Sequence, residues 1–160
     1  MATALAAGCS APADPGRDAE TVARVGDGDT LSTGDGDRVR LVQIDAPELG
    51  EAECFARQAQ RELERLAPRG SGIELEPDPG LDDEDRFGRL LRYVHAGEVN
   101  VNVELVRRGA ATPYFFGGDE GRYADDLLDA VATARQERRG MWGACLVEWK
   151  PDRPVVTRSR

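Results

Sequence analysis

A cation and two carboxylates lie close together in the segment Val39–Glu48, whose sequence is V-R-L-V-Q-I-D-A-P-E. Its first half is rich in β-branched and aliphatic residues, which favours a strand, but Arg40 interrupts the apolar run. Pro47 fixes its own φ and turns the chain out of the sheet, so Asp45 and Glu48 lie where the strand ends. This arrangement suits a site that holds a metal ion and an anion together. It would also fit an edge-strand arginine beside a solvated acidic turn.

A second acidic turn precedes this segment. Residues 26–31 read G-D-G-D-T-L, and the glycines permit the positive φ values of tight turns. Hard cations such as Ca²⁺ take oxygen ligands from carboxylates, backbone carbonyls and water, so Asp29 and Asp45 could form part of one coordination shell. The loop does not match an EF-hand, because Leu31 occupies position five of a loop that begins with Asp27. Such turns also occur in solvent with nothing bound.

Arg89 is the second notable cation. It lies in D-R-F-G-R, where Gly88 would let the backbone approach another group closely, and we predict that Arg89, like Arg40, lies on a strand. Guanidinium groups in strands are costly unless a carboxylate or a phosphate pairs with them. The two arginines therefore indicate either phosphate binding or internal arginine–carboxylate bridges. Glu48 could activate a water as a general base, although exposed glutamates after proline are ordinary.

Other hydrolytic chemistries lack their residues. His95 is the only histidine, and it has no partner in the sequence, so we interpret it as structural. This argues against histidine-based hydrolysis and most zinc sites. The sequence also contains no G-x-S-x-G motif and no constellation of cysteine and histidine, which argues against nucleophilic catalysis.

The elements that must position these residues follow from the hydrophobic pattern. Strand candidates at residues 21–25, from 30 onward, and 38–44 succeed each other in meander order, with a hairpin loop at Thr33–Asp37, and predict a small antiparallel barrel. Helical spacing predicts three helices. The remaining expectations are these: helices at Cys54–Ala67, Asn100–Arg108 and Tyr123–Arg139; strands at Ile73–Glu76 and Arg86–His95; an acidic loop at Asp78–Asp85; and a frayed tail at Leu146–Arg160.

A parity problem accompanies the strand 38–44. Side chains alternate between the faces of a strand, so Arg40 and Asp45 would point to opposite faces of a regular one. They can serve one phosphate only if the chain bends or bulges before Asp45.

Composition limits the class of protein. The 160 residues suffice for one domain with one core, and no run of about 18 apolar residues is present. With 21 basic and 30 acidic residues the net charge is −9, which argues against unspecific coating of nucleic acid. Lys150 is the only lysine, so nearly all positive charge is on arginine, the residue suited to bidentate phosphate contacts.

The first nine residues, M-A-T-A-L-A-A-G-C, resemble a bacterial lipobox, in which Cys9 would be lipidated. They lack a basic n-region and are short for an apolar h-region, so either the true start lies upstream or the likeness is chance. Ser10–Glu20 is expected to be a flexible tether. We therefore predict a signal and linker at residues 1–20, a domain at 21–146 and a C-terminal tail at 147–160.

Five blocks in order resemble the thermonuclease (staphylococcal-nuclease-like) family. They are D-G-D-T-L, V-R-L-V-Q-I-D-A-P-E, D-R-F-G-R, V-N-V-E-L-V-R-R-G and R-R-G-M-W-G, and the match runs from about Val22 to Cys145. The resemblance implies an α+β fold that is mainly a β barrel, namely a five-stranded OB-fold barrel with three packed helices. It implies a Ca²⁺-dependent endonuclease that hydrolyses DNA or RNA and leaves 3′-phosphates. The alternative is a catalytically silent OB-fold module that binds nucleic acid or protein.

The resemblance also assigns roles to single residues. The family's catalytic residues fall on Arg40, Glu48 and Arg89, and its calcium ligands fall on the carboxylates of Asp29 and Asp45 and on the backbone carbonyl of Ala46. Ala46 replaces a common threonine, which a carbonyl ligand tolerates. The substrate-binding aromatic residues fall on Phe87, Tyr114 and Phe116, and Phe116 lacks the hydroxyl of the family's tyrosine.

The cysteines fit an exported member of this family. A disulfide between Cys54 and Cys145 would tie the C-terminal helix to the loop after Glu48, and Cys9 would be left over, as a lipidated residue would be. The alternative is three reduced thiols in a cytosolic protein. We therefore expect a monomer that is extracellular or lipid-anchored at the cell surface, and the resemblance implies single- or double-stranded DNA or RNA as its partner.

Overall fold

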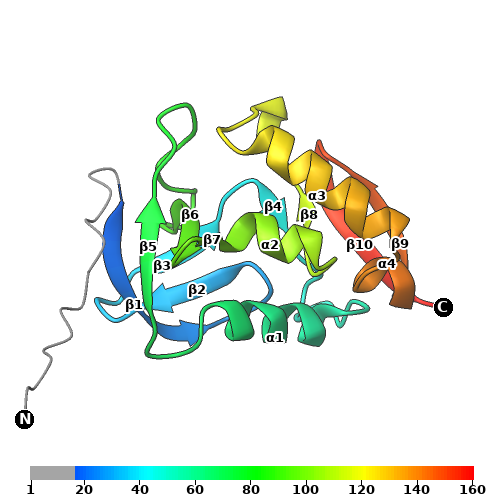
Figure 1. Cartoon of the computed structure of the whole chain (residues 1–160), viewed down its shortest axis with the longest axis horizontal. Coiled ribbons are helices and arrows are strands. Elements are labelled where there is room, and N and C mark those ends of the chain that lie inside the picture. The colour runs from blue at the N-terminus through cyan, green and yellow to red at the C-terminus, as the bar shows by residue number, and fades with distance from the viewer. Residues whose placement is uncertain (1–16) are drawn as a thin grey trace, which may run out of the picture.

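The computed structural model describes residues 17–160, and its centre is a closed β barrel (Figure 1). The barrel strands are β1 (Asp18–Val25), β2 (Thr30–Thr33), β3 (Arg38–Leu41), β5 (Gly72–Glu76) and β6 (Leu90–Ala96), in the order β3-β2-β1-β5-β6. Parallel pairing of β3 with β6 closes the barrel, and the short β7 (Val99–Asn100) pairs antiparallel with the end of β6. The five-stranded barrel is confirmed, but its sheet is mixed, not antiparallel throughout.

Strand β1 shows how the barrel coils. Its first half pairs with β5 and its second half with β2, and a register shift between Val22 and Arg24 marks the change. A bulge of this kind increases strand twist and lets one long strand belong to both sides of a small barrel. Strand β3 alternates regularly: Val39 and Leu41 are fully buried, whereas Arg40 faces the other way. This alternation places the guanidinium on the outer surface of the barrel.

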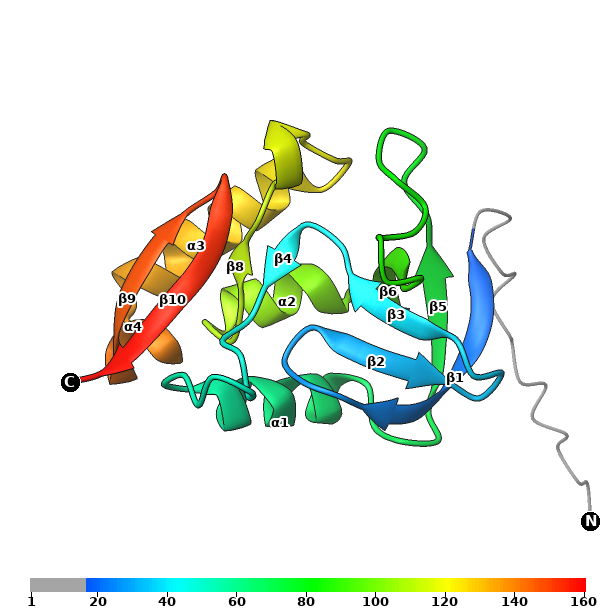
Figure 2. The ribbon, with the colours of Figure 1, turned by 180° about the vertical axis from the view of Figure 1, so that it is seen from behind.

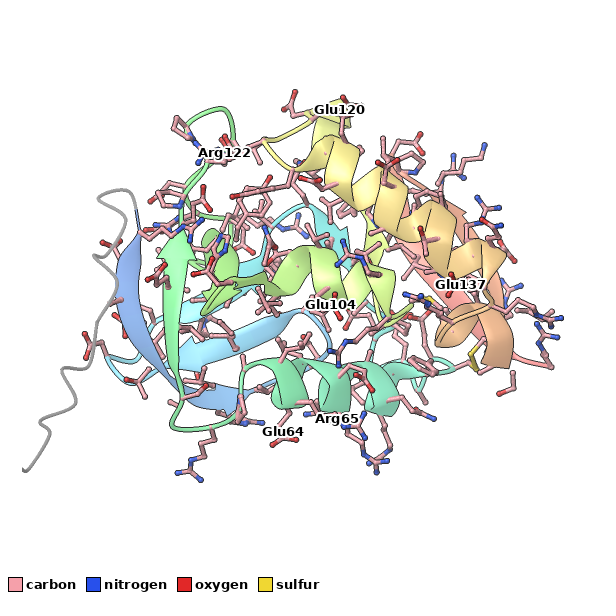
Figure 3. The ribbon with its side chains drawn as sticks, viewed as in Figure 1. Glu64, Arg65, Glu104, Glu120, Arg122 and Glu137 are labelled. Atoms are coloured by element: carbon pink, nitrogen blue, oxygen red, sulfur yellow. A yellow bond between two sulfur atoms is a disulfide. The ribbon has the colours of Figure 1, made fainter. Side chains whose placement is uncertain are left out.

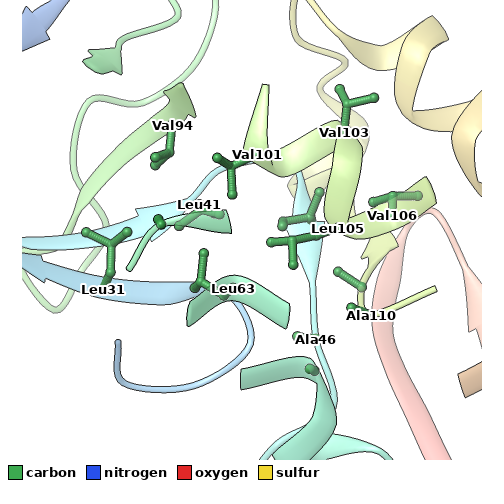
Figure 4. Packing of buried hydrophobic residues seen from close by; sticks show 14 of the residues in the cluster. Leu31, Leu41, Ala46, Leu63, Val94, Val101, Val103, Leu105, Val106 and Ala110 are labelled. Carbon is green, nitrogen blue, oxygen red and sulfur yellow. The ribbon is translucent and has the colours of Figure 1, made fainter. Parts of the chain in front are cut away.

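Three helices cover the barrel, as expected: α1 (Ala56–Leu66), α2 (Val101–Arg107) and α3 (Ala124–Gln136). Figure 4 shows Leu31 and Leu41 of the barrel meeting Leu63 of α1 and Leu105 of α2, and none of these side chains is more than 1% exposed. Two short elements, η1 (Phe116–Gly118) and α4 (Met141–Ala144), flank α3. The outer helix faces carry charged side chains such as Glu64 (Figure 3), and no helix within residues 17–160 has the length and apolarity to cross a membrane.

The predicted C-terminal tail is wrong. Leu146–Arg160, expected to be frayed, lies mostly in a hairpin of β9 (Cys145–Lys150) and β10 (Arg153–Ser159). The two prolines of this segment do not prevent strand formation, because Pro151 lies in the turn and Pro154 lies where the register shifts, positions that tolerate proline. Val155 and Thr157 are buried, so the strand has a period of two that its short length concealed.

Two smaller boundaries also differ. Strand β1 begins at Asp18, so the expected tether of residues 10–20 ends earlier than predicted. The strand expected at Arg86–His95 begins only at Leu90, because Asp85 forms a turn in which its carboxylate accepts hydrogen bonds from the amides of Phe87 and Arg89.

His95 is buried, in agreement with a structural role. Its Nε2 lies 2.6 Å from Glu76 Oε2, and the same carboxylate oxygen accepts a hydrogen bond from the Tyr123 hydroxyl. The His95–Glu76 pair thus joins β6 to β5 and, through Tyr123, to the start of α3. This pair lies at a distance from Arg40 along the barrel strands.

Candidate active site

Arg40 of β3 holds two buried aspartates with one guanidinium group. Its NH2 lies 3.1 Å from Asp29 Oδ2 and 3.0 Å from Asp45 Oδ1, and its NH1 donates to the carbonyls of Leu41 and Ile44, both at 2.8 Å. The side chain is only 13% exposed. The expected internal bridges are therefore present, and they join the same residues that were predicted to bind metal and phosphate.

The bend predicted before Asp45 is confirmed. Gln43 has a φ of 63°, in the left-handed region that non-glycine residues rarely adopt, and β4 (Ile44–Asp45) starts directly after it. The turn is fixed from outside, because the Asn102 side chain donates to the Val42 carbonyl at 2.9 Å and the Tyr114 amide donates to the Gln43 carbonyl at 2.9 Å. The bend moves Asp45 to the face that carries Arg40.

Gln43 and Asn102 were missed by the sequence analysis. The Gln43 side chain donates to the Asp119 carbonyl at 2.8 Å and accepts from the Gly121 amide at 2.7 Å, so it joins the bend to the loop before α3. Asn102 is fully buried in α2 and also accepts from the Val94 amide. A polar residue among the valines of a helix is the only sequence signal that could have indicated Asn102.

The acidic turn of residues 26–31 packs tightly against the bend. Asp29 Oδ2 accepts a hydrogen bond from the Ala46 amide at 2.8 Å, and the Asp29 carbonyl accepts one from the Leu41 amide at 2.8 Å. Gly28 lies against α1 and the bend, because a Cβ there would be 2.6 Å from Ala46 Cβ and 2.8 Å from Ala59 Cβ. Asp29 is thereby fixed beside Asp45 by backbone contacts that leave no room for a side chain at residue 28.

Gly28→Ala should therefore destabilise the protein. The added methyl group would force apart the turn, the bend and α1, at a cost of about 2 kcal/mol in the free energy of unfolding. Urea denaturation followed by circular dichroism would measure it. Gly34→Ala is the matched control, because a Cβ there meets nothing closer than 3.8 Å. Equal stability of the two variants would contradict the proposed close packing.

The site carries more negative than positive charge. Burial raises the pKa of Asp29 to about 7, against the attraction of Arg40 and with the help of Asp27 and Asp45. Burial also raises the pKa of Asp45 despite Arg40. The pKa of Glu48 is raised by partial burial and then by the charges of Asp27 and Asp45. Four carboxylates thus share one buried guanidinium, which is a setting that favours a bound cation.

The donor set fits a hard cation. Asp29 and Asp45 offer carboxylate oxygens beside the backbone of Ala46. Within residues 17–160 no group of three or more acidic, cysteine or histidine side chains forms a metal-binding cluster, so the other ligands of a cation here would be carbonyl and water oxygens. Two carboxylates with carbonyl and water oxygens suit Ca²⁺. They do not suit zinc, which prefers nitrogen and sulfur ligands.

Arg89 reaches the same face from a turn, so its predicted place on a strand is wrong. It precedes β6, and its Nε pairs with Asp85 Oδ2 at 2.6 Å. Its NH1 lies 3.5 Å from Thr30 Oγ1, which donates to Asp29 Oδ1 at 3.2 Å. Thr30, which the sequence analysis did not single out, therefore links the second arginine to the carboxylates around Arg40.

Aromatic rings flank the arginines on two sides. Phe87 is 57% exposed, and its ring centroid lies 5.6 Å from the guanidinium carbon of Arg89. Tyr114 and Phe116 form an edge-to-face pair with centroids 6.3 Å apart, and Phe116 is 73% exposed. Tyr114 lies beside the bend before Asp45, because its amide donates to the Gln43 carbonyl, and burial with the charge of Asp45 raises the pKa of its hydroxyl. Exposed rings of this kind can stack on nucleotide bases.

Glu48 lies at the edge of the site. It follows the buried Pro47 and is exposed, and its backbone amide donates to Glu53 Oε2 at 2.8 Å. The structure thus brings Asp29, Arg40, Asp45 and Arg89 into one connected group, with Glu48 within the electrostatic reach of Arg40.

A family model described as "Staphylococcal nuclease homologue" matches residues 38–144. The chain belongs to the staphylococcal nuclease family. It is 35% identical to Protein ParB of Escherichia coli over 134 residues, which cover 76% of this chain and 70% of ParB. It is 28% identical over 127 residues to the thermonuclease of Staphylococcus intermedius, covering 76% of this chain and 74% of the relative.

Other relatives are longer. The SPbeta prophage-derived endonuclease YokF of Bacillus subtilis (strain 168) is 30% identical over 129 residues, which cover 76% of this chain but 43% of YokF. The chain spans 12% of endonuclease YhcR from the same strain. These proteins bear on the chain only through the nuclease-family domain that they share with it.

The family domain is closed by a disulfide between Cys54 and Cys145, whose Cα atoms lie 6.0 Å apart. The bond joins the loop before α1 to the first residue of β9. Cys9 lies outside the described residues. Asp29, Thr30 and β10 fall outside the part of the chain that the family model matches, although the first two contact the site directly.

Proposed function

We propose that the chain is a Ca²⁺-dependent nuclease that hydrolyses phosphodiester bonds of DNA or RNA and leaves 3′-phosphates. The observation that carries this proposal is the buried group of Arg40, Asp29 and Asp45, joined through Thr30 to Arg89, in a member of the staphylococcal nuclease family. A purely structural bridge would not need a second arginine beside it, nor further carboxylates that add to the effect of burial in raising the pKa of Asp29 to about 7.

Each residue then has a defined task. Asp29, Asp45 and the backbone of Ala46 would hold Ca²⁺, which would polarise a phosphoryl oxygen. Arg40 and Arg89 would bind the phosphodiester by charge-assisted hydrogen bonds and stabilise the charge that builds up in the transition state.

Glu48 would orient the attacking water and accept its proton. Its raised pKa brings its carboxyl group closer to the range in which a general base works at neutral pH. Phe87, Tyr114 and Phe116 would stack on the bases on either side of the scissile phosphate, which gives affinity without sequence preference.

The decisive assay measures degradation of single-stranded DNA and of RNA in Ca²⁺ or in EGTA. We expect turnover only with Ca²⁺, a loss of about a hundred-fold in kcat for Glu48→Gln, and products that polymerase extends only after a phosphatase has removed the terminal phosphate. Glu64→Gln, on the exposed face of α1, is the control and should match the wild type. Full activity in EGTA would refute the metal-dependent mechanism, and the absence of activity on either substrate would favour a silent binding module.

We also infer that the protein is exported and acts as a monomer. The Cys54–Cys145 disulfide supports export, because such bonds persist in oxidising compartments. Attachment to the cell surface through a lipidated Cys9 is part of the same proposal. Mass analysis of the cell-associated protein would test it: a mass without lipid, on a chain that retains Cys9, would contradict the anchor.

A further inference from the structure

The C-terminal hairpin of β9 and β10 contacts the proposed site at three places, although the family match ends at residue 144, where the hairpin begins. Figure 2 shows β10, β8 (Thr112–Pro113), β4 and β3 following one another from left to right across the molecule. We propose that this hairpin is a positioning element of the active site, which holds Asp45 and the loop of Glu48 in their working places. The inference rests on the proposed nuclease function.

The first contact is with Asp45. The Val155 amide donates to Asp45 Oδ2 at 2.9 Å, while Oδ1 of the same carboxylate faces Arg40. The amide is available because it faces away from β9, as the Thr157 amide does, and Val155 is not part of the ladder with β9. The two oxygens of Asp45 are thus divided between the guanidinium and the hairpin, and this fixes the rotation of the carboxylate.

The second contact is with the loop that carries Glu48. Glu53 accepts a hydrogen bond from the Glu48 amide with Oε2 and one from the Thr157 amide, at 3.1 Å, with Oε1. The Thr157 hydroxyl donates to the Cys54 carbonyl at 2.7 Å, and Cys54 is bonded to Cys145 at the start of β9. The hairpin therefore holds this loop at Glu53 and Cys54, and Glu53 in turn holds the Glu48 amide.

The third contact is with the segment of Tyr114. The Phe115 amide donates to the Pro151 carbonyl at 2.6 Å, and the indole N–H of Trp149 donates to the Pro113 carbonyl at 2.8 Å. Three separate segments, each with a proposed site residue, thus contact one hairpin.

The site needs such support because its own strands are short. Asp45 lies in the two-residue strand β4, which pairs only with the two-residue strand β8. A ladder of this length cannot fix a side chain by itself, and catalytic groups must be held within about 0.5 Å of their working geometry. The hairpin supplies the missing fixed surface.

The test removes one N–H group and leaves every side chain in place. Because β9 starts with Cys145, a synthetic peptide of residues 145–160 can be joined to residues 1–144 by native chemical ligation. Replacing Val155 with its α-hydroxy acid analogue converts the amide to an ester and deletes the donor to Asp45. The same replacement at Val156 is the matched control, since amides alternate in direction along a strand and this one faces β9.

We expect the ester at Val155 to lower kcat on single-stranded DNA about ten-fold and to raise the Ca²⁺ concentration needed for half-maximal activity, with KM for DNA unchanged. The ester at Val156 should lower the denaturation midpoint in urea by a similar amount but leave kcat and the Ca²⁺ requirement as in the ligated wild type. Thr157→Val should lower kcat about three-fold, and Thr157→Ser, which keeps the hydroxyl, should restore it.

The outcomes separate the two proposals. Normal kcat and Ca²⁺ requirement in the Val155 ester, in an active wild type, would reduce the hairpin to a structural element and leave the nuclease function intact. Equal losses of kcat in both esters would do the same, because the loss would then follow stability. A ligated wild type without nuclease activity would overturn the proposed function and this inference together.

Discussion

Replacing Arg40 with alanine is expected to abolish nuclease activity and to destabilise the fold. The guanidinium is the cation that Asp29 and Asp45 share, and these side chains belong to residues only 3% and 6% exposed. Without it, two carboxylates remain buried and mutually repulsive, which costs about 3–5 kcal/mol when one partner of a buried ion pair is removed. Loss of a group that stabilises transition-state charge should lower kcat about a thousand-fold. Turnover of single-stranded DNA and urea denaturation at pH 8 measure the two effects.

The control variants separate charge from geometry. Arg40→Lys keeps the charge, but an ammonium group lacks the planar guanidinium that contacts two carboxylates and two carbonyls at once. We therefore expect this variant to be more stable than Arg40→Ala but inactive. Arg24→Ala, on the exposed side of β1, should resemble the wild type. Ca²⁺ should stabilise Arg40→Ala more than the wild type, because it would replace the lost counter-charge. An active Arg40→Ala would show that this arginine is a structural bridge only.

The barrel and the three helices could be predicted because their signals are local. Alternation in β3 and helical spacing in α1 are written in consecutive residues, and the bend before Asp45 follows from the parity of Arg40 and Asp45. The hairpin of β9 and β10 could not be predicted in this way. Its two prolines are typical of a tail, and its strand character depends on packing Val155 and Thr157 against segments a hundred residues away in the chain.

Only the charged residues of the candidate site could be predicted from the sequence. Arg40, Asp29 and Asp45 are conspicuous as charges in turns and strands, and they do meet. Their supports are neutral groups that act through contacts distant in sequence: the Thr30 hydroxyl and the Asn102 amide. The residues next to Thr30 and Asn102 in the sequence do not distinguish these two side chains from polar side chains that simply face solvent. Arg89 was expected on a strand because it directly precedes the strand residues of β6. The turn that Asp85 makes by bonding the amide and the guanidinium of Arg89 is not visible in the residue pattern.

The second large effect is expected for Asp29→Asn, which should remove activity and yet stabilise the metal-free protein at high pH. The pKa of Asp29 is about 7 in the folded protein, against 3.8 as its ordinary value. The folded protein therefore binds more protons than the unfolded chain between these values, so the contribution of Asp29 to stability falls as the pH rises through this window. At about 1.4 kcal/mol per unit, the penalty at pH 8 is up to roughly 4 kcal/mol.

Asparagine avoids this penalty because it carries no charge to desolvate. Its carbonyl oxygen can accept the hydrogen bond that Asp29 accepts from the Ala46 amide, and Arg40 keeps its contact with Asp45. Without one of its two carboxylates, however, the site should bind Ca²⁺ weakly. We therefore expect Ca²⁺ to raise the denaturation midpoint of the wild type at pH 8 and to leave that of Asp29→Asn almost unchanged, with activity lost at every Ca²⁺ concentration tested.

The measurement must compare two proteins instead of following one. Burial lowers the pKa of His95, so the contribution of that group to stability rises with pH through its own titration and opposes that of Asp29. Urea denaturation of the wild type and Asp29→Asn in EGTA at pH 5 and pH 8 cancels the histidine, which both proteins contain. The stability of Asp29→Asn relative to the wild type should rise between the two pH values, whereas that of Asp35→Asn, in the exposed hairpin loop, should stay constant. If the difference for Asp29→Asn is constant as well, folding does not raise the pKa of this carboxyl group. The electrostatic argument for a cation-binding site would then fail.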